Sequence, residues 1–291
     1  FFGDRNVFSQ AEQDELLKEY SIEDQKKLFV VKPIYQRSLI VAAGPFANFV
    51  LAIFIFAFIY MFAGKDFTPA QIQEVQKDGP AFVAGIKNGD IISSIDNNKV
   101  NSIMEVSTFI NASTNDQINI EVLRNEEPLT FLVMPKSFEG KDTLGNKVSK
   151  KIIGIKISPP NNEINRERLG PASALFYAVK ETYFVTKTSL NFVVALFKGK
   201  GDTKQLGGPI KIAKITGQVS KHGVIAFLSI MAYISISLGF INLFPIPMLD
   251  GGHLMFYAFE KILGKPLTQH TQEGFFRICL FLFISLLFFT T

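Results

Sequence analysis

The sequence predicts a polytopic α-helical membrane protein with a water-exposed α+β domain inserted between its membrane helices. Hydrophobic residues make up 47% of the 291 residues and charged residues 19%, against about 25% charged residues in soluble domains. Long runs without any charge alternate with a stretch in which charges, Asn and Gly return. This composition excludes intrinsic disorder, a coiled coil and a repeat solenoid, and it argues against a wholly soluble chain.

Residues 1–38 form a polar segment that contains many Lys and Arg residues. Cytoplasmic flanks of membrane helices are enriched in these residues, so we expect this segment inside the cell. The chain begins at Phe1 without a signal-peptide pattern, and we expect its native start to lie upstream. Residues 39–64 carry no charge and are predicted to form a transmembrane helix, because the run is long enough to cross a core of about 30 Å.

Residues 66–160 are predicted to form the inserted domain, on the outer side of the membrane. Short apolar stretches predict strands, and Asn88-Gly89-Asp90 is a turn signal. The polar run 137–150 is expected to be a surface loop. The predicted strands cover residues 72–75, 91–95, 118–123, 129–134 and 152–157, and the predicted short helices cover 81–86 and 103–112.

Residues 171–220 are expected to hold an interfacial helix followed by a Gly-Gly-Pro-Ile segment. The helical part is strongly apolar, but Lys180, Glu181 and Lys187 interrupt it, and charges at mid-bilayer are costly. With an interfacial helix here, the next transmembrane segment returns the chain, and the loop that contains Lys261 and Lys265 lies inside the cell. The alternative, a spanning helix, would place that loop outside. Residues 223–263 and 272–291 are predicted to contain the remaining transmembrane helices.

The most informative stretch runs from Asn242 to His253 and reads NLFPIPMLDGGH. Pro245 and Pro247 break a membrane helix just before the carboxylate of Asp250. Irregular backbone at membrane depth is tolerated only where it is buried in protein or lines a wet cavity, and an ionisable residue there marks a functional site by default. The residues alone leave open a metal or ion ligand, a proton relay, a gating kink, or a carboxylate that only caps the next helix.

This stretch resembles the signature of the site-2 protease family, the zinc-dependent intramembrane metalloproteases, close to its RseP type. The run AGPFANF at Ala43–Phe49 is similar to the family's AGPxAN motif, and Leu206–Ile210 is similar to its GPI segment. Gly79–Ala81 and Asn88–Ile95 are similar to PDZ domains, which implies one PDZ-like domain within residues 66–160. These segments follow the family order over essentially the whole chain.

The resemblance implies a Zn²⁺ site. In this family the two His of an HExxH motif and the Asp of the DGG motif hold the metal, and the Glu of HExxH is the general base. Carried over, Asp250 is the metal ligand. No HExxH occurs in this sequence, whose histidines are His222, His253 and His270, so no catalytic residue is assigned within it.

The resemblance also implies which residues surround that metal ligand. The proline-broken segment would border the site and help to bind the substrate backbone, and the AGPxAN helix would line it from the other side. Small residues in a spanning helix also have a purely structural use, which is to let helices pack closely. The expected lining residues are Asn242, Pro245, Pro247, Asn48, Gly44 and Pro45.

The resemblance implies that the complete protein is an intramembrane endopeptidase of the bacterial inner membrane. It would cut a membrane-anchored protein, such as an anti-sigma factor, within its transmembrane segment, while a periplasmic PDZ-like domain binds extended peptide. Because HExxH is missing, the chain alone is expected to be inactive. The alternative is a non-catalytic membrane adaptor. An ion transporter is disfavoured, because no further carboxylate lies in the two uncharged runs.

Charge and cysteine content exclude two other classes. The net charge is +4, but no basic run longer than Lys150-Lys151 occurs with interleaved aromatic residues, so nucleic acid is not expected as a partner. The single cysteine, Cys279, excludes an internal disulfide framework and any multi-cysteine zinc or iron–sulfur site.

Overall fold

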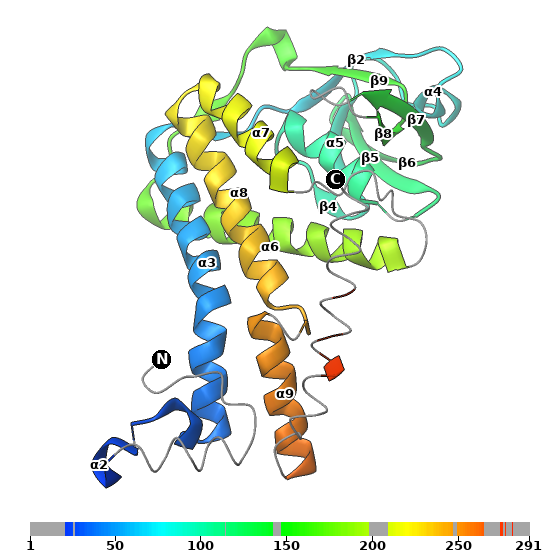
Figure 1. Ribbon diagram of the computed structural model, residues 1–291. Helices are drawn as coiled ribbons and strands as arrows, with labels where there is room; N and C mark the ends of the chain where they lie inside the picture. The colour runs from blue at the N-terminus through cyan, green and yellow to red at the C-terminus, as the bar shows by residue number, and fades with distance from the viewer. Residues whose placement is uncertain are drawn as a thin grey trace. The chain divides into compact units, whose positions relative to one another are not determined.

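The computed structural model describes residues 21–25, 27–113, 115–141, 147–197, 209–246 and 249–264, together with positions 274, 275, 277 and 281. Apart from those last positions, the predicted C-terminal helix over 272–291 lies outside the described residues, as do residues 1–20 and Pro247. The chain divides into two units (Figure 1). The helical unit comprises Phe1–Ile55 and Ser229–Thr291, and the domain unit comprises Phe56–Leu228.

Two helices in the described part of the chain are long and apolar enough to cross a membrane. They are α3 (Ile34–Phe62) and α8 (Val224–Asn242). Helix α3 begins earlier than the uncharged run, directly after Pro33, a residue whose fixed backbone angle suits a helix start. The short helices α2 (Ile22–Gln25) and η1 (Phe29–Val31) precede it.

The predicted break in the second membrane segment lies between α8 and α9 (Asp250–Leu263). Helix α8 ends at Asn242, and Pro245 follows in the connection. Proline has no N–H to donate to the helix ladder and disfavours the helical conformation of the residue before it. Pro245 therefore prevents α8 from continuing, and Asp250 starts the next helix.

The domain unit is built on an antiparallel sheet with strand order β6-β5-β3-β2-β9, to which β4 adds on β3. Isoleucine and valine side chains from these strands and from α5 form its core. The sheet strands are β2 (Ala70–Val75), β3 (Ile91–Ile95), β4 (Asn98–Lys99), β5 (Ile118–Arg124), β6 (Glu127–Val133) and β9 (Ile155–Ser158). The remaining elements are β1 (Lys65–Asp66), β7 (Lys136–Lys141), β8 (Lys147–Ile152), β10 (Arg166–Glu167), α4 (Pro80–Val83), α5 (Ile103–Ala112), η2 (Pro160–Asn162), α6 (Pro171–Phe197), α7 (Pro209–Val219) and η4 (Ser220–His222).

An ion pair holds the turn before β3 against β5. Asp90 is almost fully buried, and Nε and Nη2 of Arg124 donate to its two carboxylate oxygens, each over 2.7 Å. Burial alone would raise the pKa of Asp90, but the hydrogen bonds from Arg124 and from the Lys87 N–H outweigh it and hold the pKa below its ordinary value. Gly89 makes the turn possible with a φ of +90°.

Two sequence predictions for this domain are wrong. The described residues of the predicted surface loop 137–150 lie in strands β7 and β8, which pair from Lys136↔Ile152 to Lys141↔Lys147. The predicted strand 152–157 is interrupted at Ile153 and Gly154. Gly154 has a φ of +75°, and the carbonyl of Ile153 accepts a hydrogen bond from the Ala81 N–H instead of joining a ladder.

Helix α6 presents small residues to the domain and large apolar residues outward. Ala174 and Ala178 are fully buried, and Phe184 packs edge-on against Phe109 of α5 at 4.9 Å between ring centroids. The exposed apolar side chains are Leu175, Phe176, Val179, Tyr183, Leu190 and Val194.

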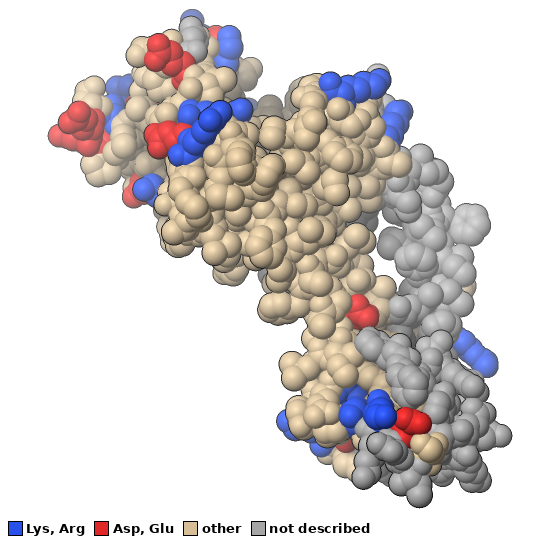
Figure 2. All heavy atoms as spheres, turned by 90° about the vertical axis from the view of Figure 1, so that its left-hand side faces the viewer, with Lys and Arg blue, Asp and Glu red and all other residues tan. Residues whose placement is uncertain are grey.

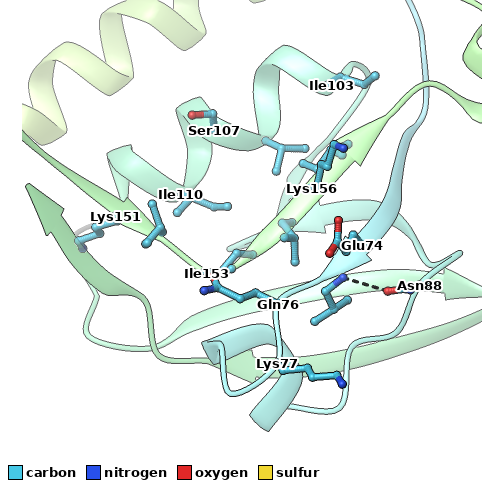
Figure 3. Close-up of a pocket in the computed structure, with 16 residues that line it drawn as sticks. Glu74, Gln76, Lys77, Asn88, Ile103, Ser107, Ile110, Lys151, Ile153 and Lys156 are labelled. Carbon is cyan, nitrogen blue, oxygen red and sulfur yellow. Dashed lines mark hydrogen bonds between the residues drawn. The ribbon is translucent and has the colours of Figure 1, made fainter. Parts of the chain in front are cut away.

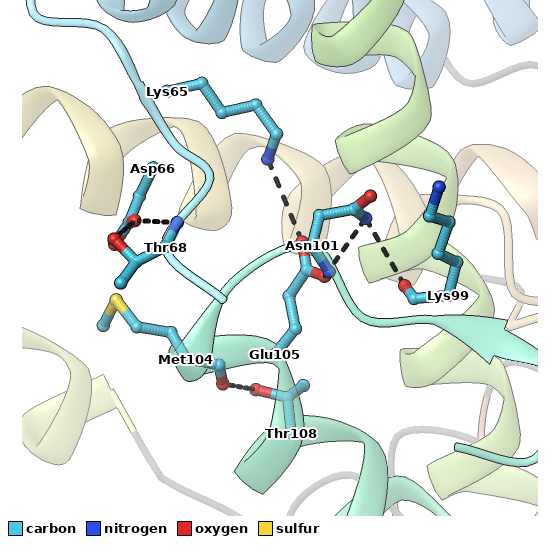
Figure 4. Close-up of polar contacts among 8 residues, drawn as sticks. All are labelled: Lys65, Asp66, Thr68, Lys99, Asn101, Met104, Glu105 and Thr108. Carbon is cyan, nitrogen blue, oxygen red and sulfur yellow. Dashed lines mark hydrogen bonds and ion pairs between the residues drawn. The ribbon is translucent and has the colours of Figure 1, made fainter. Parts of the chain in front are cut away.

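Lys65 ties the end of α3 to the domain (Figure 4). Its side chain is buried, its Nζ lies 3.9 Å from an oxygen of Glu105 on α5, and three aromatic rings surround the ammonium. The ring centroids lie 5.2 to 5.8 Å away, distances at which a cation is attracted to an aromatic face. The rings belong to Tyr60, Phe67 and Tyr177.

Candidate functional site

The helical unit brings the AGPxAN helix and the DGG helix together. Gly44 on α3 has no side chain, and the position that a Cβ would occupy there lies 3.2 Å from Oδ2 of Asp250. A larger residue at 44 would therefore push against the carboxylate. The structure thus places Gly44 and Asp250, two residues singled out from the sequence, in direct contact.

Pro45 and Asn48 lie on the part of α3 that packs against α8. A Cβ on Gly239 of α8 would lie 3.0 Å from the Pro45 carbonyl oxygen and 3.2 Å from Cβ of Asn48. The hydroxyl of Ser235 donates to the backbone carbonyl of Asn48 over 2.8 Å. Pro45 and Asn48 therefore lie in the contact between α3 and α8. The small residues Gly239 and Ser235 of α8 allow the two helices to approach closely there.

The connection before Asp250 is tightly packed. A Cβ on Gly251 would overlap the carbonyl oxygen of Phe244 and the carbonyl group of Leu243, so only glycine allows this approach. Asn242 ends α8, and Pro245 lies in the connection with its side chain exposed. The contacts described for these two residues do not include Asp250.

The carboxylate of Asp250 is a suitable metal ligand in its chemistry, but one carboxylate does not make a zinc site. A carboxylate oxygen is one of the groups that bind Zn²⁺ in proteins, where three protein ligands and an open position are typical of catalytic sites. The residues that the structure describes contain no group of three His, Cys, Asp or Glu side chains close enough to hold an ion. The described residues therefore do not form a complete zinc site by themselves.

The sequence interpretation missed Arg37 and Glu260, which form an ion pair with 2.7 Å between Nη2 and Oε1 in the helical unit. A weak signal existed, because Arg37 is the last charge before the uncharged run of α3. Its partner on α9 could not be found from sequence pattern alone.

The domain unit contains a groove of about 880 Å³ between α5 and β9 (Figure 3). Strand β9 is the last in the sheet order, so its outer edge faces this groove without a neighbouring strand among the described residues. Val75 N–H donates to the Asn88 side chain at one side of it, over 2.9 Å. The apolar lining residues are Val75, Ile103, Val106, Ile110, Ile152, Ile153, Ile155 and Ile157.

Comparisons with known proteins agree on one family. The model of peptidase family M50 matches residues 10–286. A protein of Agrobacterium fabrum, "Putative zinc metalloprotease Atu1380", is 35% identical over 291 residues, which cover 100% of this chain and 77% of that protein. "Metalloprotease MmpA" of Caulobacter vibrioides is 31% identical over 311 residues, with 99% and 77% covered.

Part of the chain also has a weak match among solved structures. The PDZ domain of an SdrC-like protein from Listeria innocua is 22% identical and covers 33% of this chain and 99% of that one, with a TM-score of 0.25. That score is too low to assign a fold, so the groove is interpreted from its own residues.

Proposed function

Because this chain belongs to peptidase family M50, the site-2 protease family, we propose that it forms part of a zinc-dependent intramembrane endopeptidase. The observation that carries the proposal is the contact between Gly44 and Asp250. It places a carboxylate at a break between two helices, against a helix long enough to span a membrane. Regulated cleavage of a membrane-anchored protein, such as an anti-sigma factor, is the activity that this arrangement serves.

Asp250 would be one ligand of the zinc ion. When bound with an open position, zinc lowers the pKa of a coordinated water toward neutrality and so supplies the nucleophile. The chain's own residues hold the carboxylate in place: Gly44 leaves room for it, and Gly251 lets α9 start directly beside the end of α8. Zinc metalloproteases among the relatives support this assignment.

Removal of zinc tests the proposal. The full-length protein, reconstituted in lipid vesicles with a membrane-anchored reporter substrate, is expected to lose cleavage when 1,10-phenanthroline removes the metal. Added Zn²⁺ should restore it, while Mg²⁺, which prefers oxygen ligands in an octahedral shell, should not. Cleavage that continues unchanged in metal-free protein would exclude the metalloprotease assignment.

We further propose that the protein is a multi-pass protein of the bacterial inner membrane, with the domain unit in the periplasm. Helices α3 and α8 would span the bilayer, and on the face drawn in Figure 2 a wide area of surface carries no charged side chain. Helix α6 would lie on the periplasmic surface of the inner membrane. Its exposed apolar residues share one face, and Lys180 and Lys187 are positioned to reach the lipid headgroups.

A label on α6 tests its contact with lipid. In a variant that lacks Cys279, an environment-sensitive dye at Phe176→Cys is expected to shift its emission to the blue in vesicles. The side chain at this position is exposed on the protein surface and would therefore be in contact with lipid. The same dye at Glu126→Cys, in the exposed turn between β5 and β6, should report water. Equal emission from both positions would contradict the membrane contact of α6.

The groove of the domain unit would bind an extended peptide. An edge strand beside an apolar groove lets a peptide add to the sheet through main-chain hydrogen bonds while its side chains enter the groove. Here β9 provides the edge and α5 the opposite wall. The ligand would be an exposed segment of the membrane-anchored substrate.

Filling the groove should weaken peptide binding without unfolding the domain. Ser107 lines the groove with an exposed side chain, so Ser107→Trp is expected to weaken binding of an apolar peptide by about tenfold or more, the equivalent of about 1.4 kcal/mol. The matched control is Thr108→Trp, one residue further along α5, exposed but outside the groove. Fluorescence anisotropy of a labelled peptide measures both, and equal affinities would refute the groove as the peptide site.

A further inference from the structure

We propose that Arg37 is a positioning residue, whose contacts with α9 hold the carboxylate of Asp250 against Gly44. The expected effect on catalysis rests on the proposed function. The expected effect on the packing of α3 against α9 within the helical unit does not. The group of contacts around Arg37 is called the Arg37 clamp and consists of Arg37, Lys32, Tyr257 and Glu260.

Three contacts fix the guanidinium of Arg37. Its Nη2 lies 2.7 Å from Oε1 of Glu260, and the two side chains are only 13% and 17% exposed. Its Nε donates to the carbonyl oxygen of Lys32 over 3.0 Å. Its central carbon lies 5.0 Å from the ring centroid of Tyr257, the distance of a cation–π contact. The side chain is therefore anchored to its own helix start while it holds two residues of α9.

The clamp and the site lie in the same register. Arg37 precedes Gly44 by seven residues on α3, and Tyr257 follows Asp250 by seven residues on α9. Seven residues make about two helical turns, which bring side chains back to the same face and span about 10 Å. The two helices therefore touch along one face at two levels, the clamp at one level and the Gly44–Asp250 contact at the other.

The ion pair between Arg37 and Glu260 resists rotation of α9 about its axis. Glu260 lies near the C-terminal end of α9, where the partial negative charge of the helix end disfavours a carboxylate. An ion pair shielded from water costs much more to break than an exposed one, because the remaining charge is left uncompensated. Rotation of α9 about its axis would separate Glu260 from Arg37, so the pair opposes the same motion that would turn Asp250 away from Gly44.

A disulfide between positions 44 and 250 measures this register without any catalysis. Cγ of Asp250, whose place the sulfur of a cysteine would take, lies 3.9 Å from the Cβ position at residue 44. The two cysteine side chains would therefore lie side by side, and a rotation of α9 would change how often their sulfurs reach the specific geometry of a disulfide bond. The parent protein for this test is the full-length chain in vesicles with Gly44→Cys and Asp250→Cys, in which Cys279 is replaced by Ala. The readout is the rate of cross-linking under copper phenanthroline.

We expect Arg37→Glu and Glu260→Arg each to slow cross-linking by about tenfold, because each places like charges side by side in the clamp. The double exchange, Arg37→Glu with Glu260→Arg, restores the attraction and should recover at least about threefold of the loss. The control is Lys261→Glu, a charge reversal at the adjacent exposed position of α9, which should leave the rate unchanged. Single variants that behave like this control, or a double variant no faster than the slower single, would overturn the proposal.

Two further measurements keep the test decisive. If Arg37→Glu does not fold, Arg37→Lys keeps the charge but loses the Nε contact and the planar stacking, and an unaltered cross-linking rate in that variant would overturn the proposal. With Gly44 and Asp250 intact, the clamp variants should lower kcat on the reporter substrate by about tenfold with KM within about twofold. A wild-type protein that cleaves nothing would refute the proposed function, while the cross-linking rates would still decide the clamp.

Discussion

Replacement of Asp250 with Ala in the full-length protein is expected to abolish cleavage of a membrane-anchored reporter. The loss should reach about a thousandfold or more, the equivalent of about 4 kcal/mol of transition-state stabilisation, because a catalytic metal provides several kcal/mol of it. The variant should also bind less zinc, which elemental analysis of the purified protein measures. The site has room for the change, since Ala is smaller than Asp and Gly44 leaves open space beside it.

Two controls separate the metal role from a structural one. Asp250→Asn keeps the size of the side chain but removes the charge, and it should lose zinc and activity nearly as completely. Asp24→Ala removes an exposed carboxylate that pairs with Lys27 on the surface and should change neither, as surface pairs contribute little. Full zinc content and full cleavage in Asp250→Ala would show that Asp250 is not the metal ligand. A wild-type protein that binds peptide but neither holds zinc nor cleaves the reporter would instead favour the peptide-binding membrane adaptor.

Gly251→Ala is expected to have the second-largest effect, although the added methyl group touches no reacting atom. A Cβ at 251 overlaps backbone atoms of Leu243 and Phe244, so the connection between α8 and α9 must move to accept it. A displacement of about 1 Å at a catalytic group can cost about a hundredfold in rate. We therefore expect a loss of cleavage of about that size, with protein abundance and peptide binding by the groove retained.

The matched control for Gly251→Ala is Gly217→Ala in α7. A Cβ at Gly217 meets nothing within 4 Å, and Ala is the better helix former, so cleavage should be unchanged or the protein slightly more stable. Cleavage rates of the two variants, measured at equal protein amounts, check the prediction. Equal activity in both would show that the tight approach at Gly251 is not required for function.

The corrections within the domain unit show where sequence patterns lose information. The strand predicted over 152–157 contains alternating isoleucines, but Gly154 takes a φ of +75°, which apolar spacing does not reveal. The hairpin of β7 and β8 was expected to be a loop because its residues are polar. Its strands pair through backbone hydrogen bonds, which depend little on side-chain polarity.

The sequence by itself indicated the family, which the comparisons confirm, and it predicted Asp250 as a metal ligand. The family followed from the resemblance of short motifs such as NLFPIPMLDGGH and AGPFANF to the family's signatures. The charge-free runs and the proline-broken helix before a carboxylate indicated only a membrane protein with a functional site near Asp250. Only the tertiary structure showed that Asp250 touches Gly44, that Arg37 holds Glu260, and that α5 and β9 enclose a groove. Helical periodicity states which residues share a face, but the partner of that face depends on packing between segments far apart in the chain.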